Sequence, residues 1–257
     1  MNILVCVKRV PATGGRVTLT GDGLAIDARF LSFTISPHEE CAVEEAVRLV
    51  EASGGGTTTV LTLGAEAAAD QLRDALAVGM TRAIHLVTDG EDWDPMATAA
   101  AIVGVVRADA AEGFDHDLVL FGNEAADSGD YQVPIRVAAA LDRPWLTGVK
   151  GLDVEGTSVR ARRDGTRGQE VYHVPLPAVL AVREGLNRPR YPSIPGRLRA
   201  KKVAIMATRP ERQVGGPTMI RLRVPDEEDA QVHVLGTGAE AAPAVVDLLE
   251  SLGLVNP

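Results

Sequence analysis

Aromatic residues, cysteines and long apolar runs are all scarce in this sequence of 257 residues. Aromatic side chains make up 4% of the chain, so the core must be built mainly from Ala, Val, Leu and Ile. The 2 cysteines, Cys6 and Cys41, are too few for a disulfide framework and lack the spacing of metal ligands. No apolar run approaches the roughly 18 residues that a membrane-spanning helix needs. The composition therefore predicts an ordinary globular protein without a structural metal and without a membrane span.

Positive charge is also in short supply, because the formal net charge is -9. Nucleic-acid binding needs a basic face, so this balance argues against a nucleic-acid partner. The N-terminal stretch MNILVCVKRV lacks the long apolar region and the small-residue cleavage site of a signal peptide. We therefore expect a cytoplasmic protein.

The familiar catalytic motifs are missing as well. There is no Walker loop, no G-x-G-x-x-G after a strand and no G-x-S-x-G elbow. The stretch GTGAEA at 236–241 is followed by too little chain for a dinucleotide fold, so a helix-start turn explains it better. The histidines are scattered without metal-ligand spacing: His38, His85, His116, His173 and His233. We expect a protein that holds one molecule and docks another, without catalytic residues of its own.

Strand and helix patterns alternate through the first half of the chain. Short β-branched runs predict strands, and apolar residues at helical spacing predict helices between them. The expected strands are 2–10, 57–64, 83–87 and 117–122. One helix is expected to begin at Ser36-Pro37, and three others are expected to cover 65–79, 95–112 and 131–141. This alternation predicts an α/β fold in which helices cover both faces of a twisted parallel sheet.

The helix that begins at Ser36-Pro37 has the clearest pattern. Serine suits the helix cap, and proline is tolerated at the first helical position. The apolar residues recur at helical spacing, whereas the acidic residues are expected to point away from the core: Glu39, Glu40, Glu44 and Glu45. The glycines at 54–56 are expected to end the helix.

The pattern changes after Pro144. Residues 149–182 are expected to form a small antiparallel extension with turns at Gly156 and at 164–165. The segment EGLNRPRYPSIPGRLRAKK (184–202) has prolines three residues apart and many basic side chains, and we expect it to be extended rather than helical. We divide the chain into a domain of residues 1–205 and a C-terminal arm of residues 206–257, whose last helix must pack on another surface.

Ligands of an open parallel sheet bind beyond the carboxyl ends of its strands. The most unusual strand end is GNEAADSGDYQV, which runs from Gly122 to Val133. Its small residues leave the backbone accessible, and the helix start that follows suits a phosphate, with Ser128 as a further donor. A plain strand-to-helix turn capped by Asp130 explains the same spacing, so both interpretations stay open at this point.

Four stretches of the sequence together resemble the beta subunit of electron transfer flavoprotein. They are ILVCVKRVP, SPHEECAVEEAVRL, ALAVGMTRAIHL and LNRPRYPSIPGRLRAKK, which occur in the family's order and cover residues 2 to about 203. The resemblance implies a fold like the adenine nucleotide alpha hydrolases and a heterodimer with an alpha subunit that binds most of the FAD. It also implies a bound AMP, or a second FAD in its place, in the beta subunit. Electrons would come from flavin dehydrogenases such as acyl-CoA dehydrogenase and pass to a downstream quinone oxidoreductase.

The resemblance also implies which residues contact the adenine nucleotide. Matching the family's motif position by position gives residues that follow or end the predicted strands: Cys6, Ser36, Pro37, His38, Glu39, Leu63, Gly122, Asn123, Glu124, Ala125, Ala126, Asp127, Ser128, Gly129, Asp130, Tyr131, Gln132 and Val133. Three positions depart from the family's pattern. His38 stands where an aromatic residue is usual, and Val133 and Pro134 replace a Thr and a Gly. A histidine there is expected to hydrogen-bond the flavin or carry charge near it, or else to be a solvated loop residue.

The proline-rich segment matches the family's recognition loop, which docks on dehydrogenases. Ile194 matches the apolar anchor that inserts into a pocket of the dehydrogenase, and the basic residues would steer toward an acidic partner. The partner-binding residues expected on this basis are Leu186, Pro189, Arg190, Tyr191, Pro192, Ile194, Pro195, Arg197, Arg199, Lys201 and Lys202. The alternative is an ordinary loop over the chain's own core in which Ile194 is buried.

Two other classes of protein were weighed against this interpretation. A nucleotide-binding regulator that resembles universal stress proteins would form homodimers and would lack the proline-rich loop and the arm. An adenylating enzyme of the ATP-pyrophosphatase type needs a Ser-Gly-Gly loop after the first strand, where this chain reads KRVPATGG. The regulator is the alternative that remains.

Overall fold

The computed structural model describes residues 1–12, 17–224 and 233–255. A nine-stranded sheet runs through the body in the order β11-β5-β4-β1-β6-β10-β7-β8-β9. Its strands are β1 (Asn2–Val7), β4 (Thr57–Gly64), β5 (Arg82–Val87), β6 (Leu118–Gly122), β7 (Trp145–Glu155), β8 (Ser158–Gly165), β9 (Gly168–Pro175), β10 (Ala178–Val182) and β11 (Ile205–Thr208). A second sheet pairs β2 (Val10–Pro11) with β3 (Phe33–Thr34). The α/β fold with a mostly parallel sheet is confirmed.

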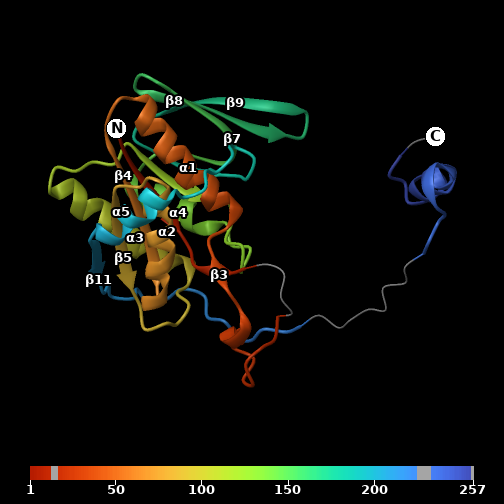
Figure 1. The fold of residues 1–257 in the computed structure, drawn as a ribbon, viewed down its shortest axis with the longest axis horizontal. Coiled ribbons are helices and arrows are strands. Elements are labelled where there is room, and N and C mark those ends of the chain that lie inside the picture. The colour runs from red at the N-terminus through yellow and green to blue at the C-terminus, as the bar shows by residue number, and fades with distance from the viewer. Residues whose placement is uncertain (13–16, 225–232, 256–257) are drawn as a thin grey trace.

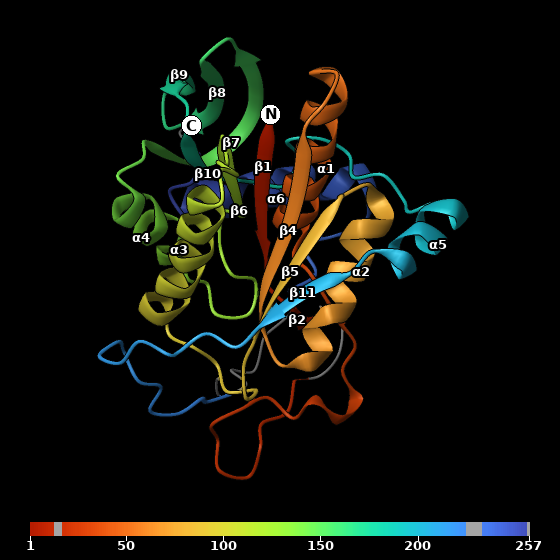
Figure 2. The same cartoon turned by 90° about the vertical axis from the view of Figure 1, so that its left-hand side faces the viewer.

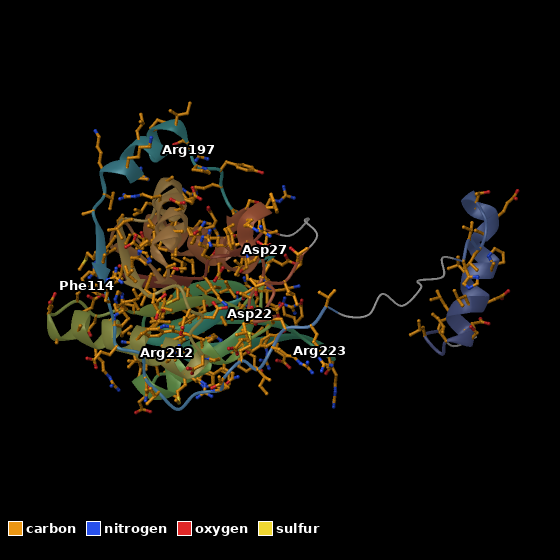
Figure 3. All side chains as sticks on the ribbon, turned by 90° about the horizontal axis from the view of Figure 1, so that it is seen from below. Asp22, Asp27, Phe114, Arg197, Arg212 and Arg223 are labelled. Atoms are coloured by element: carbon orange, nitrogen blue, oxygen red, sulfur yellow. The ribbon has the colours of Figure 1, made fainter. Side chains whose placement is uncertain are left out.

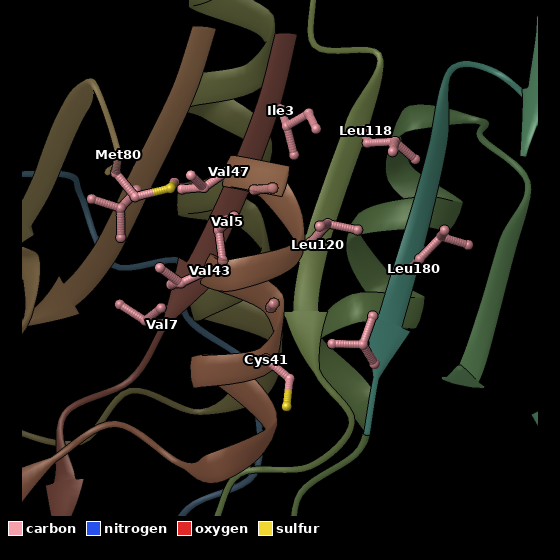
Figure 4. Close-up of a cluster of buried hydrophobic side chains, with 14 of the residues drawn as sticks. Ile3, Val5, Val7, Cys41, Val43, Val47, Met80, Leu118, Leu120 and Leu180 are labelled. Carbon is pink, nitrogen blue, oxygen red and sulfur yellow. The ribbon is translucent and has the colours of Figure 1, made fainter. Parts of the chain in front are cut away.

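Helices cover both faces of the sheet (Figures 1 and 2). The helices on the body are α1 (Pro37–Ala52), α2 (Ala69–Val78), α3 (Pro95–Ala111), α4 (Gln132–Leu141) and α5 (Ile194–Lys202), whereas α6 (Ala242–Ser251) is separate from them. On one face α1 and α2 pack against alternate residues of the central strands, including Ile3, Val5 and Leu120 (Figure 4). On the other face α3 and α4 pack against the residues between them, such as Leu4 and Phe121. Strands buried on both sides explain why the sequence shows continuous apolar runs.

The antiparallel extension is smaller than expected. β7, β8 and β9 pair antiparallel, as predicted, but β10 lies between β6 and β7 and is parallel to both. Every residue of β10 is buried. The prediction that residues 178–182 belong to the antiparallel extension was therefore wrong, because the hairpin carries the chain back into the middle of the main sheet.

The proline-rich segment also differs from the prediction. Residues 184–193 are irregular, but Ile194–Lys202 form helix α5. Ser193 caps this helix through a hydrogen bond from Gly196 N to its Oγ (3.1 Å), and Pro195 lies in the first turn, where its missing N–H costs nothing. The expectation that the whole segment is extended was wrong for its second half.

The arm begins as an edge strand and continues along the body. The expected division after residue 205 falls inside β11, which pairs in parallel with β5. Arg212 then donates to Glu91 (3.2 Å), and Leu222 N donates to the carbonyl of Gly23 (2.8 Å), so the arm meets the excursion of residues 17–34 (Figure 3). Parts of the expected arm, residues 225–232 and 256–257, lie outside the described residues.

Helix α6 stands apart from the sheet and its covering helices in Figure 1. None of its residues is buried. The exposed apolar side chains on it and just after it are Val245, Val246, Leu248, Leu252, Leu254 and Val255. An isolated helix of this length gains little stability from its own backbone, so its apolar side chains need a second surface.

Among the residues that the structure describes, no helix is both long and apolar enough to cross a membrane. The same residues contain no group of three or more His, Cys, Asp or Glu side chains arranged to hold a metal ion.

Candidate functional site

The strand order places one reversal point in the sheet. From β1 the chain moves outward through β4 and β5, and it then crosses back to form β6 on the other side of β1. The carboxyl ends of β1 and β6 therefore border a crevice between helices that lie on opposite faces, which is where open α/β sheets bind ligands. The loops that follow β1 and β6 and the start of α1 are the parts of the chain that reach this point.

The start of α1 is fixed by a reciprocal cap. The Ser36 Oγ accepts a hydrogen bond from Glu39 N (3.2 Å), and Glu39 Oε2 accepts one from Ser36 N (2.8 Å). The other carboxylate oxygen of Glu39 accepts from Lys8 N (2.7 Å), just beyond β1. This arrangement satisfies backbone donors that a helix start leaves free and joins α1 to β1. The predicted helix start at Ser36-Pro37 is confirmed.

Gly122 brings the end of β6 against the start of α1. A Cβ atom at this position would lie 2.9 Å from Glu39 Cγ, 3.2 Å from His38 Cβ and 3.4 Å from Ser36 Oγ. Only glycine permits this approach without displacing a neighbour. Residues that are far apart in the sequence and were predicted to share a site therefore meet here.

The loop after Gly122 folds back on itself. Gly129 N donates to the carbonyl of Ala125 (2.7 Å), and Gly129 has a φ of +64° that suits glycine. Asp130 Oδ1 accepts from Gln132 N (2.8 Å), the first residue of α4. Pro134 has no N–H, so Val133 keeps the amide of the first helical turn that can still face a ligand. The N-cap of α4 is Tyr131, which makes no side-chain cap hydrogen bond, so Asp130 supports the helix start only from the position before the cap.

Asn123 and Asp127 tie this loop to its surroundings. The Asn123 side chain is buried, and its Oδ1 accepts from Gly148 N (2.7 Å) in β7. The Asp127 carboxylate pairs with the ammonium of Lys8 at 2.6 Å. Lys8 was not among the predicted site residues, because the expected strand of residues 2–10 continued past the observed end of β1 at Val7. Lys8 directly follows Val7, the last residue of β1.

His38 connects the crevice with the proline-rich segment. Its Nδ1 accepts from Glu184 N at 2.8 Å, so in the neutral ring the proton sits on Nε2. Nε2 lies 3.8 Å from Glu124 Oε1, and only 12% of the side chain is exposed. His38 belongs to the first turn of α1. The interpretation of His38 as a solvated loop residue was therefore wrong.

Two further cofactor candidates, Cys6 and Leu63, lie at strand ends with their side chains packed on the core. Cys6 is 6% exposed and packs among the residues under α3 and α4, and burial raises the pKa of its thiol. Leu63 packs against the same cluster. Both residues can present only their backbone to the crevice, together with that of the neighbouring Gly64.

An open pocket of about 390 Å³ adjoins the loop on the side of the β8–β9 hairpin. Its lining residues are mainly polar: Asn123, Tyr131, Thr147, Gly148, Arg163, Asp164, Gly165, Thr166, Glu170 and Arg183. Glu170 holds Arg163 at 2.6 Å, and Arg183 is exposed. The pocket widens the crevice beyond the predicted residues, which included only Asn123 and Tyr131 from this lining.

Three glutamates of α1 were predicted to point to solvent, but they are buried. Glu39, Glu44 and Glu45 are 6%, 4% and 2% exposed. Buried carboxylates need hydrogen-bonded or charged partners. Glu39 has the cap described above, and Glu44 and Glu45 receive donors from the proline-rich segment. The prediction failed because those donors lie more than 140 residues later in the chain.

The proline-rich segment presents its apolar residues outward. Ile194 is 77% exposed and Tyr191 is 96% exposed, so the alternative in which Ile194 is buried over the core is wrong. Figure 3 shows the α5 side chains, Arg197 among them, projecting from the body. Leu186 instead packs against the core, Arg199 donates to the carbonyl of Leu76 (3.2 Å), and Arg190 pairs with two glutamates of α1, so these three are engaged within the chain. The docking role of the exposed residues stays a prediction.

Glu39 is expected to make the free energy of unfolding depend on pH. Burial raises the pKa of its carboxyl from 4.5 to about 7, although hydrogen bonds from Ser36 and Lys8 oppose the shift. A carboxyl with a raised folded-state pKa contributes stability that is complete below pH 4.5 and is lost as the pH rises through about 7. We expect the unfolding free energy of the wild type, relative to Glu39→Gln, to fall by about 3 kcal/mol across this window. Urea unfolding of both proteins at a series of pH values measures the difference, and parallel pH profiles would contradict it.

Comparison with known proteins adds a family to this geometry. Residues 25–211 match the family model described as "Electron transfer flavoprotein domain". The chain is 32% identical over 260 residues to the electron transfer flavoprotein subunit beta of Bacillus subtilis, with 98% of each chain covered. It is 36% identical over 202 residues to the protein of the same name from Syntrophomonas wolfei, covering 79% of this chain and 77% of that one. The same subunit of Mycobacterium tuberculosis is 36% identical over 206 residues.

Proposed function

This chain belongs to the electron transfer flavoprotein family as a beta subunit, and on that premise we propose that it holds an adenine nucleotide and docks flavin dehydrogenases. In this proposal an alpha subunit is its permanent partner, and a downstream quinone oxidoreductase receives the electrons. The flavin bound mainly by the alpha subunit supplies the electron transfer. The residues of this chain bind, orient and dock.

The observation that carries the nucleotide proposal is the meeting of Gly122 with Ser36 and Glu39 at the reversal point of the sheet. The close approach leaves backbone rather than side chains at the centre of the crevice. The groups able to face a phosphate are the Val133 amide at the start of α4, the Ser128 hydroxyl and the Lys8 ammonium. We propose AMP as the ligand, with a second FAD as the alternative that the adjoining polar pocket favours.

The alpha-subunit proposal is supported by the unburied apolar side chains of α6 and of the residues after it. The docking proposal is supported by the exposed Ile194 among basic residues on α5. A small apolar anchor with a charged rim suits a short-lived redox encounter, in which affinity must stay low enough for fast exchange. Electrons would pass when the alpha subunit's flavin-binding part swings toward the docked dehydrogenase, a class of rigid-body motion that proteins use widely.

The nucleotide is tested by extracting and counting AMP and FAD from the chain purified together with its alpha subunit. For Gly122→Ala we expect about tenfold weaker retention of the adenine nucleotide, because overpacking costs roughly 1–3 kcal/mol and about 1.4 kcal/mol is tenfold in affinity. The matched control is Gly104→Ala, since a Cβ at Gly104 would meet nothing within 4 Å.

Three results would overturn parts of the proposal. Unchanged nucleotide content in Gly122→Ala would place the ligand elsewhere. A heterodimer without any adenine nucleotide would remove the ligand altogether. Recovery of the chain as a nucleotide-bearing homodimer that ignores a flavoprotein partner would favour the regulator that resembles universal stress proteins.

A further inference from the structure

The proline-rich segment of residues 184–202, called the recognition segment below, is held to α1 by an ion pair that is buried on its acidic side. The guanidinium of Arg190 donates from Nε to Glu44 Oε2 (2.9 Å) and from Nη2 to Glu44 Oε1 (2.9 Å). The backbone N–H of Arg190 also donates to Glu44 Oε2 (3.0 Å). A bidentate pair with an added backbone bond fixes both the side chain and the main chain of Arg190.

Further hydrogen bonds extend this attachment along α1. Arg190 Nη1 donates to Glu51 Oε1 (2.8 Å), so its guanidinium lies between two carboxylates. Asn187 Nδ2 donates to Glu45 Oε2 (2.8 Å) and to the carbonyl of Cys41 (3.0 Å). Successive turns of one helix thus hold two residues of the recognition segment. We call the set Glu44, Glu45, Glu51, Asn187 and Arg190 the α1 clamp.

The far end of the recognition segment is attached to a different helix. Gly196 lies so close to the carbonyl of Ala77 in α2 that a Cβ atom would collide with it. Arg73 of α2 donates from Nη1 to the carbonyl of Val203 (2.6 Å), just after α5. The segment is therefore fixed at both ends, by α1 before its apex and by α2 after it.

Only the stretch between these attachments is free. Tyr191 and Ile194 project from it. The side chain of Tyr191 is almost fully exposed, and that of Ile194 is largely exposed. An apex held on two sides loses less conformational freedom on binding than a loose loop does. Burying charge is a poor way to gain stability, because desolvation offsets the attraction, but it can specify one arrangement.

We propose that Arg190 and Asn187 are positioning residues, whose attachment to Glu44, Glu45 and Glu51 sets the orientation of Ile194 before a partner arrives. The partner is the flavin dehydrogenase of the proposed docking function, on which this inference rests. The clamp then governs how readily a dehydrogenase binds, without taking part in electron transfer. A purely structural role would instead affect the stability of the chain and leave the segment as ordered as before.

The test uses the complete heterodimer with its alpha subunit and the double variant Glu44→Gln/Arg190→Gln. Removing both charges together avoids an unpaired buried carboxylate, which a single change at Arg190 would leave. The matched control is Arg188→Gln, which removes the same charge from the same segment outside the clamp. Asn187→Ala is a second clamp variant, and it keeps the proposal falsifiable if the double variant fails to fold.

Two measurements are made on each protein. Hydrogen exchange reports the order of residues 186–193 with no dehydrogenase present, and we expect about tenfold faster exchange in the clamp variants. Steady-state reduction by the dehydrogenase reports docking, and we expect its KM to rise about fivefold with kcat unchanged. Arg188→Gln is expected to leave exchange unchanged, and FAD and AMP contents are expected to match those of the wild type throughout.

Each outcome decides the proposal. Faster exchange with a raised KM in both clamp variants supports it. Unchanged exchange overturns it, as does faster exchange with an unchanged KM, and an equal rise of KM in Arg188→Gln would assign the effect to charge alone. If the wild type accepts electrons from no dehydrogenase, the docking function fails, and the clamp is judged by hydrogen exchange alone.

Discussion

Replacing Ile194 by alanine will raise the KM for dehydrogenase-linked reduction by about tenfold or more. The side chain is 77% exposed in the free chain and, in the proposed complex, fills a pocket of the dehydrogenase. Burying an isoleucine is worth about 1.5–3 kcal/mol, most of which alanine gives up, and about 1.4 kcal/mol corresponds to a factor of ten in affinity. Ile194→Glu will have a larger effect, because it places a charge in the same pocket.

The effect must be confined to docking. Since Ile194 is not part of the core, the variants should keep the wild-type FAD content, nucleotide content and heterodimer stability. Stopped-flow reduction by the dehydrogenase measures the change, and reduction by dithionite serves as the partner-free reference. Leu24→Ala, at a half-exposed position on the excursion of residues 17–34, is the matched control. Unchanged kinetics in Ile194→Glu would remove this side chain from the docking surface.

Periodicity was enough to predict the parallel core. The strands that became β1, β4, β5 and β6 and the helices between them follow from runs of apolar residues whose spacing shows their type. Periodicity did not predict which strands pair with each other. AVLAV (178–182) follows a hairpin and was assigned to it, although five buried apolar residues in a row are typical of a central parallel strand.

Proline was given too much weight in the recognition segment. Pro195 excludes a helix interior but not a first turn, and Ser193 supplies the cap that makes this helix start possible. The prediction that the glutamates of α1 point to solvent was wrong for a different reason. A charged residue is expected at the surface unless a partner is known, and Arg190 and Asn187 are distant in the sequence.

The proximity of the strand-end residues could be predicted from the sequence, whereas their surroundings could not. Ser36, Glu39 and Gly122 could be brought together on paper, because parallel strands end at one edge of the sheet. Lys8 and the pocket beside the β8–β9 hairpin could not, since their place depends on side-chain direction and on β10 returning to the sheet.

The proposed interfaces and the crevice are formed by different elements of the fold. In the proposed function, docking uses α5, attachment to the alpha subunit uses α6, and the nucleotide binds at the ends of β1 and β6. Helix α1 is the element common to two of them, because its first turn forms the crevice and its later turns hold the recognition segment.

Deleting residues 233–257 will weaken the heterodimer by about a hundredfold or more. The deleted part carries the apolar side chains of α6 and of the residues after it, which the body of this chain does not cover. Burial of a valine or leucine contributes about 1.5 kcal/mol or more, so two such residues already exceed about 2.7 kcal/mol, the equivalent of a hundredfold in affinity. The remaining residues offset the ordering that association costs.

The change is measured as the dissociation constant of the two subunits, by analytical ultracentrifugation over a dilution series. Leu248→Asp tests the same face by a single charge, and Glu250→Gln on the same helix is the matched control that should bind as the wild type does. Because α1, the crevice and the recognition segment are untouched, the truncated chain should keep its nucleotide and its fold. A truncated chain that pairs as tightly as the full one would show that α6 packs elsewhere and that the body alone makes the heterodimer.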